Sequence, residues 1–207
     1  MALDTEEEQV EKIQKFWEVY KRYIISLIVV LLGIYFAFNF YAKQNIKNLE
    51  ISSQLYQEIL IEKVTSIDSI LEKVNLLKNT SSNTPYASRS AIYLSKLYSQ
   101  AKKKEAAIQE LIWARDNATE ESIQSLADYL LANLYFVDGN LEEALLTAKK
   151  IDTIGFQILA KDLIGDIYLQ QGDKEKAKQS YLKSLDSYKG QGDIRKILQN
   201  KIDSIGQ

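Results

Sequence analysis

Side chains that commonly carry out chemistry are scarce in this sequence of 207 residues. It contains no histidine and no cysteine, so the usual general base, the thiol nucleophile and the commonest metal ligands are missing. Asp162 and Asp166 lie four residues apart, which would place both carboxylates on one helical face, where they could act as a general acid and base. Acidic residues interleaved with lysine are more typical of a solvated or groove-lining face. We therefore expect a protein that is not an enzyme, with no cofactor, no metal site and no small-molecule substrate.

The composition favours helix almost throughout the chain. There are only 8 glycines and 1 proline, and 46% of the residues are hydrophobic. Sheet proteins need more turn residues than this, whereas alanine, leucine, lysine and glutamate are good helix formers. The net charge is −2, which gives no reason to expect a nucleic-acid-binding surface. The predicted fold class is all-α.

An apolar segment, residues 23–42, is long enough to cross a membrane. It carries no charged side chain, and at about 1.5 Å per residue its helix would span roughly 30 Å, the thickness of the bilayer core. It ends in bulky aromatic residues, unlike the small-residue cleavage site of a secretory signal. We therefore predict one uncleaved transmembrane helix over residues 23–42.

Basic residues on either side of this segment predict its orientation. Lys12, Lys15, Lys21 and Arg22 precede it, whereas Lys43 and Lys47 follow it within about 20 residues. The excess of basic residues upstream places the N-terminus in the cytoplasm. The chain would then consist of a cytoplasmic tail, residues 1–22, the transmembrane helix, and a domain outside the cytoplasm, residues 43–207.

The tail itself has two interpretations. Val10, Ile13, Trp17 and Tyr20 share one face at helical spacing. That face could lie in the membrane interface or bind a cytosolic partner. Alternatively, the tail is simply the start of the anchor helix.

Three segments in the C-terminal part of the chain repeat one pattern, and they begin at Leu94, Leu131 and Ile164. In each segment a tyrosine follows the aliphatic residue after four positions, and an alanine follows that tyrosine after nine. The offsets between segments, 37 and 33 residues, are close to the tetratricopeptide period of about 34 residues. The pattern predicts a tetratricopeptide-like α-solenoid after the transmembrane helix.

The shared positions suit the packing of antiparallel helices. A small residue lets two helices approach closely, a tyrosine fills the space beside it, a glycine turns the chain, and an alanine lies where the second helix crosses the first. We assign this packing to Tyr98, Ala107, Ala132, Tyr135, Gly139, Ala144, Gly165, Tyr168, Gly172 and Ala177. The first segment has Lys102 in place of the turn glycine.

Flanking segments complete the predicted domain. Residues 48–78 look like a degenerate helical pair, and Thr84 and Pro85 are typical of an N-cap followed by a first helical position. An apolar stripe near the C-terminus predicts a helix that caps the last repeat, as solenoids require. Its members are Ile194, Ile197, Leu198, Ile202 and Ile205.

Function is therefore expected from a surface. Stacked helix pairs curve, and the first helix of each pair lines the concave face. The predicted residues of that face are Arg89, Ile92, Lys96 and Ser99, then Tyr129, Asn133 and Phe136, and finally Asp162, Asp166 and Leu169. This mixture of aromatic and charged side chains suits an extended peptide or a partner protein.

The whole chain resembles the bacterial family of ancillary SecYEG translocon subunits (the YfgM family). The order of parts is the same: a short acidic tail containing TEEEQVEKIQKFW, one anchor, and a repeat domain. The resemblance is sharpest in that tail and in the third repeat, AKDLIGDIYLQQGDKEKAKQSYLKS, and the closing KIDSI is also similar.

This resemblance implies a non-catalytic adaptor or chaperone at the Sec translocon of the bacterial inner membrane, with its repeat domain in the periplasm. The implied partners are translocon subunits, a membrane-anchored periplasmic chaperone of the isomerase-like class, unfolded or emerging polypeptides, and membrane lipid. This protein and the membrane-anchored chaperone would together pass polypeptides to periplasmic folding factors. Tyr35, Phe36 and Phe40 in the anchor would be the positions that contact a membrane partner.

Other functions fit the same repeats. A structural scaffold for a cell-envelope or cell-division complex would hold one folded partner, whereas an adaptor would bind unfolded clients. A eukaryotic import receptor of similar layout would place the repeats in the cytosol. A membrane-anchored enzyme would depend on Asp162 or Asp166 for its activity.

Overall fold

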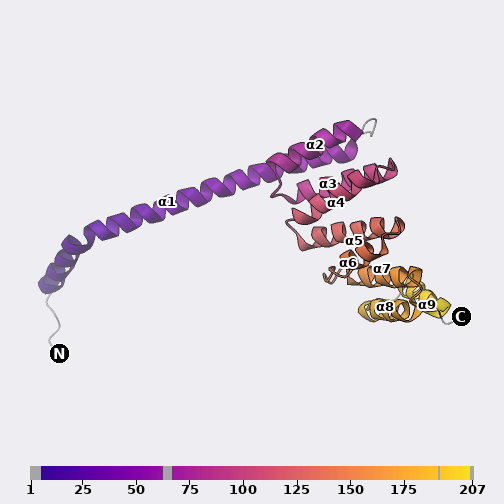
Figure 1. Cartoon of the computed structure of the whole chain (residues 1–207). Helices are drawn as coiled ribbons and strands as arrows, with labels where there is room; N and C mark the ends of the chain where they lie inside the picture. Colours follow the sequence, from indigo (N-terminus) through magenta and orange to yellow (C-terminus); the bar gives the residue numbers. More distant parts are fainter. Residues whose placement is uncertain (1–5, 63–66, 191, 206–207) are drawn as a thin grey trace, which may run out of the picture. The chain divides into compact units, whose positions relative to one another are not determined.

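The structure, a computed structural model, describes residues 6–62, 67–190 and 192–205. Within these ranges it contains α-helices and no strand, which confirms the all-α class (Figure 1). The helices are α1 (Glu6–Ile61), α2 (Ile67–Thr80), α3 (Pro85–Gln100), α4 (Lys104–Asp116), α5 (Glu121–Val137), α6 (Leu141–Ala148), α7 (Gln157–Gln170), α8 (Lys174–Ser187) and α9 (Asp193–Ile205). The chain divides into two compact units, residues 1–48 and 49–207.

The first unit contains the N-terminal part of α1 and the apolar segment. Among the described residues, α1 is the one helix that is long and apolar enough to cross a membrane, with a mean hydropathy of 2.3 over its most apolar 18 residues. The predicted span, residues 23–42, lies inside α1, which continues as helix on both sides of it. Asn39 in this span donates a hydrogen bond of 3.0 Å from Nδ2 to the backbone oxygen of Tyr35. That bond satisfies a polar group locally, as an apolar environment requires.

The tail before the apolar segment is also part of α1. It is helical from Glu6 onward, and Val10, Ile13, Trp17 and Tyr20 are all exposed. The tail and the apolar segment therefore form one continuous helix. No other described part of the first unit covers the apolar face of the tail.

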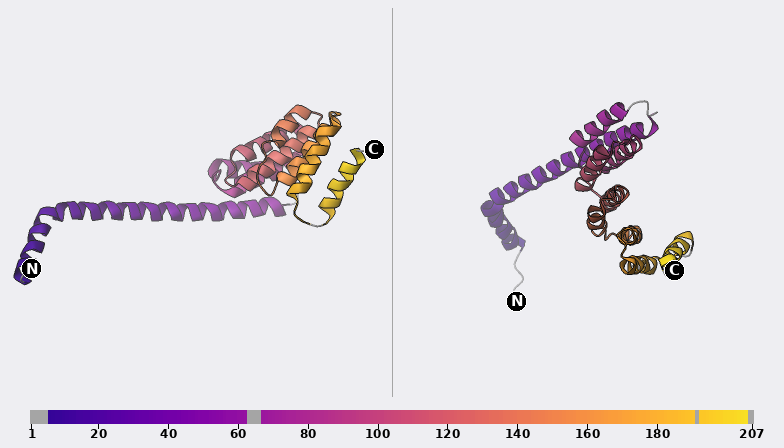
Figure 2. Two further views of the ribbon diagram at one scale, coloured as in Figure 1. Left: turned by 90° about the horizontal axis from the view of Figure 1, so that it is seen from below. Right: turned by 45° about the vertical axis from the view of Figure 1, so that its right-hand side comes forward.

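The second unit is a stack of helices in which each member packs against the next, from α2 through α9. Figure 1 shows the stack from the side, and the right-hand view of Figure 2 shows it turned by 45° about the vertical axis. Residues 49–61 of α1 join α2 through side chains, since Ile59 shares a buried cluster with Ile70 and Val74. This first pair matches the degenerate pair expected over residues 48–78, and α9 follows α8 at the C-terminal end as the predicted capping helix.

Small residues lie at the helix crossings of this stack. Four alanines assigned to packing, Ala107, Ala132, Ala144 and Ala177, are completely buried. The three repeat tyrosines are partly buried, and each packs against a different core cluster: Tyr98, Tyr135 and Tyr168. Each tyrosine thus contributes to a different part of the core.

Gly165 marks a very close approach between α7 and α8. A Cβ atom at this position would lie 2.3 Å from the ring of Tyr181, which is far inside van der Waals contact. Tyr181 is completely buried. The ring therefore occupies the space that a side chain on Gly165 would need, so only glycine fits without repacking.

The predicted start of α3 is confirmed. Thr84 is its N-cap residue and Pro85 is its first helical residue. The Thr84 hydroxyl does not cap the helix but donates a hydrogen bond of 2.8 Å to the backbone oxygen of Ser81. Pro85 has no N–H, so its place at the first helical position leaves no donor unsatisfied at that residue.

One turn recurs at the end of the first helix in all three repeats. The backbone oxygens of Tyr98, Tyr135 and Tyr168 accept hydrogen bonds of 2.8, 2.9 and 2.9 Å from the N–H five residues later. This is the Schellman motif, in which the residue after the C-cap adopts a left-handed conformation. The residues in that conformation are Gly139 with φ 81°, Gly172 with φ 84° and Lys102 with φ 58°.

We predict that Lys102→Gly stabilises the fold. A left-handed conformation costs a residue with a side chain about 1–2 kcal/mol, and glycine avoids that cost. Part of this gain in the free energy of unfolding is offset, because glycine has more conformational freedom in the unfolded chain. The expected net gain is about 1 kcal/mol, or roughly 2–4 °C in Tm. Thermal unfolding of the full chain measures it.

Ala101→Gly is the matched control for this prediction. Ala101 is the preceding residue and has an ordinary φ of −81°, so glycine there should lower Tm. A fall in Tm for Lys102→Gly as large as for Ala101→Gly would contradict the role assigned to the left-handed turn.

Candidate functional site

A cavity of about 490 Å³ lies between α3 and α5, the first helices of two successive pairs. We call it the α3–α5 groove. It is lined by Arg89, Ile92, Tyr93, Ser95, Lys96 and Ser99 of α3, by Leu130, Asn133, Leu134 and Val137 of α5, by Leu111 of α4 and by Tyr56 of α1. Most of its surface is apolar, because aliphatic side chains recur at helical spacing along α5.

The groove presents apolar surface to solvent. Val137 is 82% exposed, although valine is a residue that folding normally buries. An open concave site of this size, mainly apolar with a few polar groups, is typical of a binding site. The groove is therefore the best candidate for a partner-binding site in the described part of the chain.

Polar groups in the groove are partly engaged within the protein. The Arg89 guanidinium lies 2.8 Å from the Glu120 carboxylate, and Asn133 donates a hydrogen bond of 2.8 Å from Nδ2 to the backbone oxygen of Tyr129. Burial raises the pKa of the Tyr56 hydroxyl, so it stays a hydrogen-bond donor over the neutral range. The Lys96 side chain is exposed and adds positive charge to an otherwise apolar site.

The structure brings some of the predicted concave-face residues together and separates others. Arg89, Lys96 and Asn133 line the α3–α5 groove, as do Ile92 and Ser99. Tyr129 and Phe136 pack against the buried cluster that contains Ala132 and Ala144. Leu169 is exposed on α7.

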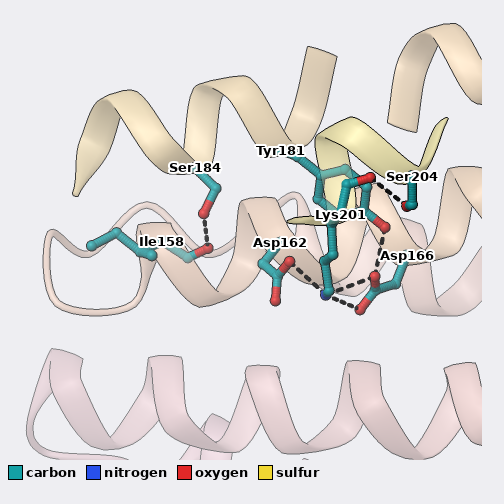
Figure 3. Close-up of polar contacts among 7 residues, drawn as sticks. All are labelled: Ile158, Asp162, Asp166, Tyr181, Ser184, Lys201 and Ser204. Atoms are coloured by element: carbon teal, nitrogen blue, oxygen red, sulfur yellow. Dashed lines mark hydrogen bonds and ion pairs between the residues drawn. The ribbon is translucent and has the colours of Figure 1, made fainter. Parts of the chain in front are cut away.

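Asp162 and Asp166 of α7 bind a lysine of α9, as Figure 3 shows. Lys201 Nζ lies 2.7 Å from Asp162 Oδ1, 2.8 Å from Asp166 Oδ1 and 2.9 Å from Asp166 Oδ2. The Tyr181 hydroxyl of α8 donates a hydrogen bond of 2.6 Å to Asp166 Oδ1. The cluster thus joins α7, α8 and the capping helix.

The electrostatics of this cluster are those of a structural ion pair. Burial would lower the pKa of Lys201, but its bonds to Asp162 and Asp166 outweigh burial and raise it. Burial raises the pKa of Asp162, although Lys201 opposes the shift. Burial and the bond to Asp166 raise the pKa of Tyr181, so its hydroxyl stays protonated. A lysine bridges the two carboxylates, so they hold the capping helix and are not available as a free acid–base pair.

Several residues that the structure places in these sites were not predicted from the sequence. Leu130, Leu134 and Val137 recur at helical spacing with Asn133, so periodicity along α5 was a signal that could have found them. Lys201 is 35 residues from Asp166, and no local pattern connects the two. Pairing over that separation becomes visible only once α7 and α9 are packed.

The three predicted contact positions in the anchor are exposed along α1. Tyr35, Phe36 and Phe40 all present large apolar side chains, and the Tyr35 and Phe36 rings meet edge to face at 5.7 Å. Exposed aromatic side chains on an apolar helix suit contact with lipid or with another membrane helix.

Stacked helix pairs, left-handed turns after each repeat tyrosine, and a groove between first helices define a helical repeat protein. A family model described as a tetratricopeptide repeat-like domain matches residues 14–207, and the chain belongs to this family.

Two relatives extend the comparison beyond the repeats. The chain is 28% identical over 182 residues to the ancillary SecYEG translocon subunit of Aggregatibacter actinomycetemcomitans, an alignment that covers 87% of this chain and 89% of that protein. It is 26% identical over 184 residues to the protein of the same name from Haemophilus influenzae, again covering 87% and 89%. The resemblance found from the sequence is confirmed.

We predict that Lys201→Met releases the capping helix. Hydrogen bonds to charged groups contribute about 1.5–3 kcal/mol, and the substitution also leaves Asp162 and Asp166 facing each other. Amide hydrogen exchange over residues 193–205 should accelerate roughly ten- to hundredfold at neutral pH. The raised pKa of Lys201 means that the wild-type contribution is complete at neutral pH and is lost only above the ordinary lysine value of 10.5.

Lys176→Met is the control for this experiment. Lys176 pairs with Asp173 at an exposed position on α8, so its loss should leave exchange in α9 unchanged. Equal exchange rates in wild type and Lys201→Met would contradict the role assigned to Lys201.

Proposed function

We propose that this chain is a non-catalytic, membrane-anchored adaptor of the Sec translocon that binds unfolded or emerging polypeptides and helps pass them to periplasmic folding factors. The α3–α5 groove is the observation that supports binding. The groove has a volume of about 490 Å³, which suits several side chains of an extended segment. Its exposed surface is mainly apolar, so it has few polar groups that would restrict binding to one particular ligand.

Association with the Sec translocon is supported by the two relatives, both named ancillary SecYEG translocon subunit. We propose that the anchor contacts the translocon through Tyr35, Phe36 and Phe40, which are exposed along α1. A membrane-anchored periplasmic chaperone of the isomerase-like class is the proposed second partner. The groove would hold a polypeptide until this chaperone receives it.

The proposed location is the bacterial inner membrane, with a single span at residues 23–42. Residues 1–22 would lie in the cytoplasm and the repeat domain, residues 43–207, in the periplasm. The excess of basic residues before the span supports this orientation, since Lys12, Lys15, Lys21 and Arg22 precede it.

We predict the orientation from thiol labelling of intact cells. The chain has no cysteine, so Gln14→Cys and Ile154→Cys each introduce a single thiol, and both positions are exposed. A maleimide that cannot cross the inner membrane should label Ile154→Cys in intact cells, and it should label Gln14→Cys only after lysis. The reverse pattern would place the repeats in the cytosol and contradict the proposal.

We predict that Val137→Asp weakens polypeptide binding. Burying a valine side chain in a complex contributes about 1.5–3 kcal/mol, so a carboxylate in its place should lower affinity about tenfold or more. Fluorescence anisotropy with a labelled, unstructured peptide rich in leucine and alanine measures this effect on the full chain in detergent micelles. Because Val137 is 82% exposed, the substitution should leave Tm almost unchanged.

Ile154→Asp is the matched control, because Ile154 is 88% exposed and lies outside the groove. It should bind the peptide as the wild type does. Equal affinities for Val137→Asp and Ile154→Asp would remove the groove as the polypeptide-binding site. Tight binding of one folded partner without any affinity for unstructured peptides would favour a scaffold.

A further inference from the structure

A second cavity, of polar character, lies on the other side of α5 from the α3–α5 groove. Its volume is about 380 Å³, and we call it the α5 polar pocket. It is lined by Arg115, Asp116, Glu121, Gln124, Ser125, Asp128, Lys150, Asp152 and Thr153. The residues of α5 in this pocket and those in the groove are on opposite faces by helical spacing, so the two sites do not share side chains.

Asp128 is the unusual member of this pocket. Asp128 is only 6% exposed, yet its Oδ1 is buried without a hydrogen-bond partner among the described residues. Buried carboxylates are normally paired or hydrogen-bonded, because removing an ion from water is costly. Burial raises the pKa of this carboxyl, while Arg115 and Lys150 oppose the shift without forming an ion pair with it. The carboxylate thus has unused capacity to accept hydrogen bonds.

Neighbouring groups in the pocket are already engaged with one another. The Arg115 guanidinium donates from Nε to Asp116 Oδ1 at 2.8 Å, so the positive charge of Arg115 is already paired with Asp116. The hydroxyls of Ser125 and Thr153 lie 2.6 Å apart, and Thr153 donates to Glu121 Oε1 at 3.1 Å. Asp128 is left out of both sets of bonds.

The charge of the lining favours a cation. Four carboxylates, from Asp116, Glu121, Asp128 and Asp152, face two basic groups, from Arg115 and Lys150, which gives a net charge of −2. Within the described residues, no group of three or more acidic side chains is arranged to hold a metal ion. An organic cation with several N–H donors matches the lining better, because it can bond to more than one carboxylate oxygen.

We propose that the α5 polar pocket binds one cationic side chain, arginine or lysine, of a partner polypeptide, with Asp128 as its main anion. The volume is sufficient for the head group and part of its aliphatic stem. The site would let the solenoid recognise charge on one side of α5, independently of whether the groove on the other side binds apolar segments.

The test compares two peptides on the full chain in detergent micelles. One is a capped pentapeptide of alanines with a central arginine and a neutral fluorophore, and the other has citrulline in place of arginine. Citrulline has nearly the same shape but no charge. Fluorescence anisotropy should show the arginine peptide binding more than about tenfold more tightly.

Two substitutions in the pocket should act in opposite directions. Asp128→Asn keeps the shape but removes the charge, and it should abolish the preference for arginine over citrulline. Lys150→Gln removes a competing cation and should strengthen arginine binding severalfold. Val137→Asn in the groove adds no charge and should leave the preference unchanged. Failure of the groove as a binding site would therefore not be mistaken for failure of the pocket.

The fold of Asp128→Asn can be checked separately. Removing a buried, unpaired charge should leave Tm equal to or above that of the wild type. Equal binding of the two peptides by the wild type, or a preference for arginine that survives Asp128→Asn, would overturn the proposal.

Discussion

Close approach of α7 and α8 at Gly165 is the contact on which the C-terminal part of the solenoid depends. The ring of Tyr181 lies where a side chain on Gly165 would be, and this position brings its hydroxyl to 2.6 Å from Asp166. Asp166 in turn holds Lys201 of the capping helix. One missing Cβ atom therefore determines a packed ring, a partly buried hydrogen bond and the attachment of α9. A solenoid needs such a cap because its last repeat would otherwise expose an apolar face.

Stacking of helix pairs also explains why binding surfaces remain open elsewhere. Each helix pair buries small and aromatic side chains where helices cross, for example at Ala132 and Ala144. The first helix of each pair keeps one face outside these crossings. Between α3 and α5 that face is apolar and forms a groove, whereas near the start of α5 the opposite face is polar and contains Asp128. The same helix can therefore present two chemically different sites. A repeat architecture allows this because packing constrains only part of each helix surface.

Much of the fold could be predicted from the sequence, because the determining signals are local. The tyrosine–glycine–alanine spacing identified the repeats, and Thr84 and Pro85 identified the start of α3. What could not be predicted depends on packing between distant segments or on backbone conformation. Lys201 meets Asp162 only after α9 folds back, and Lys102 takes a left-handed turn that its residue type disfavours. The unbroken course of α1 was visible in principle, since residues 6–61 contain no proline and a single glycine, Gly33.

Site-specific photocrosslinking during translocation tests whether the α3–α5 groove binds polypeptides in transit. A photoreactive amino acid at Asn133 in the groove, or at Ile154 outside it, would be illuminated in membranes that hold an exported polypeptide arrested in the translocon. We expect adducts with the arrested polypeptide from Asn133 and none from Ile154, together with adducts to translocon subunits from Phe40 in the anchor. Adducts from Ile154 as strong as those from Asn133, or none from Asn133 and Phe40, would contradict the proposed function.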